Sequence, residues 1–189
     1  QLFNGMQSSL SMVYDREMGS MKTMLVSPIP RWFLLTSKLI AGVFVSILQV
    51  YAFLIIASFW DIIPPLEGYF TLLPALVISG LMLGSLGMFL SSAIKQLENF
   101  AGVMNFVIFP MFFASSALYP LWKIEETSEW LFYVCQFNPF TYAVEIIRFS
   151  MYSSFNFEYT IGILVFAMIF LTFSIIGYDP TKGSMQKKG

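Results

Sequence analysis

The chain has 189 residues, of which 57% are hydrophobic and only 11% are charged, and its formal net charge is −1. Soluble domains carry about 25% charged residues, so this composition excludes an ordinary soluble domain and indicates an integral membrane protein. The near-zero net charge gives no electrostatic basis for binding nucleic acid. The chain has no histidine and a single cysteine, which removes the commonest general base and excludes an intrachain disulfide or a thiolate metal cluster.

Residues 2–13 are fairly apolar and run into a charged segment without a turn or cap between them. They carry no signal-peptide pattern. We interpret residues 1–13 as the tail of a transmembrane helix that begins before Gln1. On that interpretation the whole protein crosses the membrane about six times.

Residues 14–31, YDREMGSMKTMLVSPIPR, form the most polar segment of this apolar chain. On a helix, one face carries apolar residues at a spacing of three to four, and this face contains Tyr14, Met18, Met21 and Leu25. Pro28 predicts the end of that helix. The pattern fits a Met-rich helix seated in a groove of another protein. It fits a helix lying flat on the membrane surface equally well.

Four uncharged apolar segments are long enough to cross a bilayer, which takes about 20 residues. They are residues 39–60, 69–94, 100–122 and 159–178. We therefore predict an all-α integral membrane protein, a polytopic helix bundle forming a single domain over residues 1–189. Because these segments hold no Asp, Glu, Lys, Arg or His, they argue against a proton-coupled carrier or a voltage-gated channel.

Two of the predicted spans carry residues that shape helix packing. Gly80 and Gly84 form a small-xxx-small pair in the second span, which allows close helix contact. We favour packing within the chain over a dimer seam for this pair. Pro110 interrupts the third span, and we interpret it as a packing kink in preference to a hinge.

The distribution of basic residues predicts the orientation. Alternation of the four spans leaves only Lys123 and Arg148 on one side of the membrane. The other side receives Arg16, Lys22, Arg31, Lys38, Lys95, Lys182, Lys187 and Lys188. Basic residues are enriched on the cytoplasmic side, so residues 14–31 and the C-terminus are expected in the cytoplasm.

The outer segment, residues 123–157, is predicted to be amphipathic. Asn138 and Pro139 are a helix-start signal. After them, Thr141, Glu145 and Arg148 fall at i, i+4 and i+7 and form one polar stripe on an otherwise apolar helix. The segment is interpreted either as two amphipathic helices lying at the outer interface or as a shallow re-entrant hairpin.

Catalytic signatures are missing from the sequence. It contains no GxxxxGK[ST] phosphate loop, no GxSxG and no HExxH. Cys135 without a histidine is a poor nucleophile candidate. We therefore predict that this chain is not an enzyme and has no catalytic residue, no cofactor-binding residue and no metal site.

The stretch YDREMGSMKTMLVSPIPRWFLLTSKL resembles the cytoplasmic segment of ABC-2-type permeases, the membrane subunits of ATP-binding-cassette exporters. The shared features are an acidic-x-Gly motif, a Leu-x-x-Ser-Pro stretch over residues 25–28, and the Ser37–Lys38 pair that begins the next helix. The segment NPFTYAVEIIR, residues 138–148, is similar to the Asn-Pro helix before the last span of that family.

The resemblance implies that residues 14–31 are a coupling segment seated on a separate ATP-binding-cassette ATPase subunit. Its contact residues would be Asp15, Arg16, Glu17, Met18, Gly19, Met21 and Lys22. The outer gate helix would carry Asn138, Pro139, Glu145 and Arg148. ATP and Mg²⁺ would be bound by the ATPase, and the permease would work as a dimer, in the simplest case a homodimer.

The resemblance further implies ATP-driven export across a bacterial-type inner membrane. Two other functions stay open on the sequence. A non-transporting membrane scaffold would use residues 14–31 to recruit a cytosolic partner. A channel or secondary carrier is less favoured, because the predicted spans are uncharged.

Overall fold

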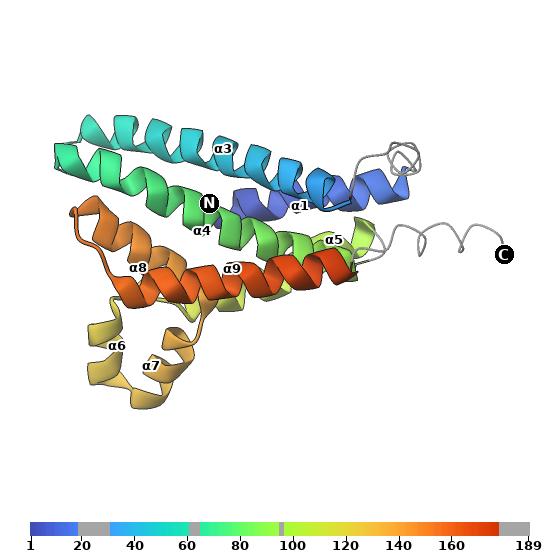
Figure 1. The fold of residues 1–189 in the computed structure, drawn as a ribbon. Coiled ribbons are helices and arrows are strands. Elements are labelled where there is room, and N and C mark those ends of the chain that lie inside the picture. The colour runs from blue at the N-terminus through green and yellow to red at the C-terminus, as the bar shows by residue number, and fades with distance from the viewer. Residues whose placement is uncertain (19–30, 61–64, 95–96, 178–189) are drawn as a thin grey trace.

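The computed structural model describes residues 1–18, 31–60, 65–94 and 97–177 (Figure 1). Every regular element in this part of the chain is helical. The long helices are α1 (Leu2–Glu17), α3 (Arg31–Ser58), α4 (Leu66–Ala93), α5 (Leu97–Phe113) and α9 (Phe157–Gly177); the shorter ones are α6 (Leu121–Thr127), α7 (Glu129–Gln136) and α8 (Pro139–Met151).

Helices α3, α4 and α9 lie side by side along one axis, and α1 packs beside α3 and α4 (Figure 1). The C-terminus of α3, the start of α4 and the start of α9 lie at one end of this bundle, together with the end of α8. Helices α6 and α7 project from its side. The all-helical architecture predicted from the composition is confirmed.

Three helices are long and apolar enough to cross a membrane, over Trp32–Ser58, Leu66–Ser92 and Phe157–Gly177. Helix α4 is the central one: 67% of its most apolar window is buried, against 22% in α3 and 11% in α9. A helix that is apolar all round is expected in that position. The exposed faces of α3 and α9 are suited to lipid.

The helix predicted over residues 100–122 is shorter in the structure. Helix α5 ends at Phe113, with Pro110 in its last turn, and turns fill the chain up to Pro120. The sequence window was apolar throughout, so hydropathy alone could not mark this end. The physical cause is a contact with a distant part of the chain: the side chain of Asn138 takes two carbonyl groups that would otherwise be satisfied by a continuing helix.

Glycines bring α4 close to its neighbours. A methyl group built on Gly84 would lie 2.4 Å from a methyl carbon of Leu39, and one on Gly80 would lie 3.2 Å from Val43. Both neighbours belong to α3, so the prediction that this pair packs within the chain is confirmed. On another face of α4, a methyl group on Gly87 would lie 2.7 Å from the backbone carbonyl oxygen of Gly5 in α1.

The contact between α1 and α4 predicts a difference between two identical substitutions. Gly87→Ala should lower stability by about 1–3 kcal/mol, because the added methyl meets backbone that cannot rotate away. Gly102→Ala in α5 is the matched control, since no atom lies within 4 Å of its added methyl. That control should be neutral or stabilising, because alanine favours helix. Thermal unfolding of the purified variants in detergent measures both, and equal melting temperatures would contradict the packing.

Candidate functional site

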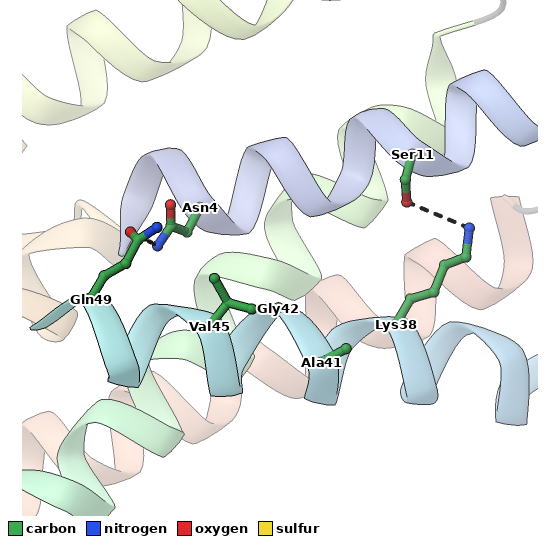
Figure 2. Close-up of a pocket in the computed structure, with 7 residues that line it drawn as sticks. All are labelled: Asn4, Ser11, Lys38, Ala41, Gly42, Val45 and Gln49. Atoms are coloured by element: carbon green, nitrogen blue, oxygen red, sulfur yellow. Dashed lines mark hydrogen bonds between the residues drawn. The ribbon is translucent and has the colours of Figure 1, made fainter.

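The end of α1 is tied to α3 by an ion pair. Lys38 Nζ donates to Asp15 Oδ2 and, at 3.5 Å, to Ser11 Oγ; Figure 2 shows the Ser11 contact. Both ends of the ion pair are partly buried, with 29% and 24% of the two side chains exposed. The charged start of the predicted coupling segment is therefore fastened to the neighbouring helix.

The other predicted coupling residues are distributed between described and undescribed parts of the chain. Arg16 and Glu17 form the last two residues of α1, and Met18 follows with 64% of its surface exposed. Gly19, Met21 and Lys22 lie outside the described residues. Among the members whose side chains the structure describes, Asp15 has a partner within this chain and Met18 has an exposed apolar side chain.

At the other side of the bundle, Asn138 joins the end of α5 to the start of α8. Its Nδ2 donates to the carbonyl oxygens of Met111 and Ala114, each at 2.6 Å, and its Oδ1 accepts from the Phe140 amide at 2.9 Å. One side chain thus caps the C-terminus of one helix and the N-terminus of the next. Pro139 occupies the first position of α8, where its missing N–H costs no hydrogen bond.

The polar stripe of α8 faces the protein. Thr141 is fully buried and Glu145 is 5% exposed. Thr141 Oγ1 accepts from the Ser116 amide at 3.3 Å, and Arg148 donates to Glu145 Oε1 at 2.6 Å and to the Ser116 carbonyl at 2.8 Å. We call Ser116, Asn138, Thr141, Glu145 and Arg148 the outer polar cluster.

The cluster bears on the two arrangements considered for this segment. A helix lying on the membrane surface would turn its polar stripe to water, whereas α8 turns it to the residues after α5 and packs on α4 and α9. These contacts are those expected of a re-entrant hairpin, and the arrangement in the membrane stays a prediction. A polar backbone turn at membrane depth is tolerated where protein covers it, and Arg148, Thr141 and Asn138 supply that cover.

Cys135 has no chemical role that the structure supports. The residue is buried in α7, and burial raises the pKa of its thiol, which lowers the thiolate fraction at neutral pH. Within the described ranges, no three His, Cys, Asp or Glu side chains come close enough to hold a metal ion.

Two features of these sites were not predicted from the sequence. Lys38 was expected before the first span, whereas α3 begins at Arg31 and includes it. A single lysine at the edge of an apolar run was the available signal. Ser116 could not be identified as the partner of α8, because that partner is a backbone group 25 to 32 residues away.

The two roles of Asn138 can be separated by one substitution. Asn138→Asp keeps the acceptor for Phe140 but sets a carboxylate against two carbonyl oxygens, so it should lower stability by about 1–3 kcal/mol or more. Asn156→Asp is the matched control, because Asn156 Oδ1 accepts from the Glu158 amide at 3.0 Å and its side chain donates to no described carbonyl. Thermal unfolding in detergent should separate the two variants; equal melting temperatures would contradict the double cap.

Two known proteins with similar sequences carry the names of membrane permeases. The chain is 30% identical over 162 residues to ycf38 of Porphyra purpurea, whose name describes a transport permease; the match covers 84% of this chain and 54% of that one. It is 30% identical over 147 residues to YbhR of Escherichia coli K12, named a multidrug ABC transporter permease, covering 75% of this chain and 38% of YbhR. No solved structure matches.

The chain spans about half the length of the curated relatives it matches. The family model described as ABC-2 type transporter matches residues 1–152, which include α1, the whole outer polar cluster and all of α8. The chain therefore belongs to the ABC-2 type transporter family, as part of its membrane permease domain.

Proposed function

We propose that this chain is the membrane-spanning part of an ABC exporter whose ATP is hydrolysed by a separate ATPase subunit, which binds the ATP and Mg²⁺. The observation that carries the proposal is the end of α1. One helix runs without a break from its glycine contact with α4 into the acidic residues of the family motif, and the Asp15–Lys38 pair fastens it to α3. A push on the end of α1 would therefore act on two further helices.

In this proposal residues 14–31 are the cytoplasmic coupling segment, and the C-terminus is also cytoplasmic. Because Asp15 is held by Lys38, the contact with the ATPase falls to Glu17, Met18 and the residues after them. The complex sits in a bacterial-type inner membrane and contains two permeases, in the simplest case two copies of one chain.

We further propose that α5 and α8 together complete a fourth membrane crossing. Helix α5 has 17 residues and is about 25 Å long, which is short of the roughly 30 Å hydrocarbon core. It stops at the Asn138 cap, and α8 continues toward the outer end of the bundle beside α4 (Figure 1).

In the same scheme α8 is the outer gate helix. Arg148 and Asn138 hold it on the turn after α5, and opening would require these hydrogen bonds to break or exchange. Residues 123–157 would then be the moving outer element of the exporter.

The coupling proposal is tested by Met18→Glu in the full-length protein. A carboxylate at this exposed position should sharply reduce co-purification of the ATPase subunit from native membranes in mild detergent, because it removes apolar contact at the docking surface. Its melting temperature should stay unchanged, because 64% of the side chain is exposed.

Tyr152→Glu is the control, since Tyr152 is 71% exposed and directly follows α8, which ends at the opposite end of the bundle from the end of α1 (Figure 1). Co-purification of the ATPase with the control but not with Met18→Glu supports the proposal. Absence of any nucleotide-binding protein from the wild-type preparation would count against an exporter. Partner binding without substrate-stimulated ATP turnover in proteoliposomes would favour the scaffold.

The gate proposal is tested by a reversible lock. Ser116→Cys and Thr141→Cys, combined with Cys135→Ala, place two thiols where the Ser116 amide and the Thr141 hydroxyl are 3.3 Å apart. Oxidation should suppress substrate-stimulated ATP turnover, and a reductant should restore it. Each single cysteine is the control. Full turnover of the oxidised, cross-linked complex would show that α8 need not move.

A further inference from the structure

A groove between α1 and α3 opens on the side of the bundle. Its volume is about 420 Å³, and its lining consists of Asn4, Ser11, Lys38, Ala41, Gly42, Val45 and Gln49 (Figure 2). We call it the α1–α3 groove. This volume is within the range of pockets that hold small organic ligands, which is about 300–1,000 Å³.

The groove is polar at its two ends and is lined by small side chains between them. Figure 2 shows Lys38 reaching toward Ser11 at one end and Asn4 hydrogen-bonded to Gln49 at the other. Between the ends, α3 presents only Ala41, Gly42 and Val45, and these small side chains leave the space open. From Lys38 to Gln49 the helix rises about 16 Å, which is close to the depth of one leaflet.

The deep end of the groove carries unused hydrogen-bonding capacity. Asn4 Nδ2 donates to Gln49 Oε1, but among the described residues none donates to Asn4 Oδ1 and none accepts from Gln49 Nε2. Gln49 is an exposed side chain near the middle of a membrane-length helix, where water is absent. An amide in that position gains from a partner that brings both a donor and an acceptor.

The charge of the groove restricts what that partner can be. Among the described residues, Lys38 is the one charged residue in its lining, and Asp15 neutralises it from α1. A groove without net charge has no electrostatic preference for an anionic or a cationic head group. Phe44 and Leu48 on the neighbouring face of α3 are 68% and 63% exposed, so lipid can reach the opening from the side.

We infer that the α1–α3 groove binds the uncharged, hydroxyl-bearing head of an amphiphile from the cytoplasmic leaflet, while the apolar tail stays in lipid beside α3. Hydroxyl groups both donate and accept, so one such head can serve Asn4 Oδ1 and Gln49 Nε2 together. The inference rests on the proposed exporter and its orientation, and it names the class of molecule that the exporter takes up.

Photolabelling of the full-length protein in lipid nanodiscs tests this inference. The probe is an alkyl glucoside with a diazirine in its alkyl chain; the comparison probes carry the same diazirine on a fatty acid and on an alkyl trimethylammonium. The glucoside should label peptides that contain residues 38–49 more strongly than either charged probe. Excess unlabelled alkyl glucoside should compete. Labelling that follows the charge of the probe, or that spreads evenly over α3 and α9, would overturn the inference.

Variants locate the label. Ala41→Phe fills the groove, and Ala52→Phe makes the same change at an exposed position farther along α3, outside the lining. Gln49→Leu keeps the space but removes the amide. Ala41→Phe should abolish labelling, Gln49→Leu should lower it about fivefold, as expected for one lost hydrogen bond, and Ala52→Phe should leave it unchanged.

Equal labelling of the wild type and all three variants would overturn the inference, and this is also the result expected if another helix covers the groove. Labelling requires neither ATP nor transport, so its outcome is independent of the exporter proposal. An ATPase that co-purifies with a protein whose groove takes no label would leave the exporter standing and remove only this inference.

Discussion

The constraint on which this structure depends is that backbone groups at membrane depth must be satisfied inside the protein. Asn138 meets that constraint at one critical point. Its side chain takes the carbonyls of Met111 and Ala114, so α5 can end inside the bundle and the chain can turn there. Without this cap the apolar sequence after Phe113 would favour a longer helix, and α8 would have no place beside α4.

Close packing around α4 supplies the second condition. Glycines on its surface let the backbone of α1 and the Leu39 and Val43 side chains of α3 pack closely against it, and such packing replaces the hydrophobic driving force that lipid cannot provide. At the start of α4, Gly68 meets the backbone of Met151, and Thr71 donates to the Ser150 carbonyl at 2.6 Å. Helix α4 therefore touches α1 along one part of its length and the end of α8 at another.

The sequence was sufficient to predict the helical membrane class, the segments that became α3, α4 and α9, and the intramolecular role of Gly80 and Gly84. These follow from properties that are local in sequence, namely apolar length and residue size. The end of α5 could not be predicted, because it depends on a side chain more than 20 residues away. The inward orientation of the polar stripe that contains Glu145 could not be predicted either. A helical period shows which residues share a face of the helix but not what that face contacts.

The site residues divide in the same way. Asn138 and Arg148 were identified from a short motif and a helical spacing, and the structure gives each a specific partner. Their role as a gate stays a proposal. Asp15 was predicted to meet another protein; it forms an ion pair with Lys38 on α3, and its contact with the ATPase stays a proposal. A sequence pattern reports which residues share a surface, whereas the partner depends on which helix comes to lie there.

The proposed mechanism follows from the position of α4 between the two polar sites. Helix α1 contacts α4 through Gly5 and Gly87, and the end of α8 contacts α4 through Met151 and Gly68. Both contacts are backbone-close, so a shift of α1 along α4 cannot be absorbed by side-chain rotation alone. A displacement that begins at the Asp15 end of α1 would then reach α8 through one rigid helix. Spatial continuity of this kind makes coupling possible, and the reversible lock of α8 measures whether the two ends share one equilibrium.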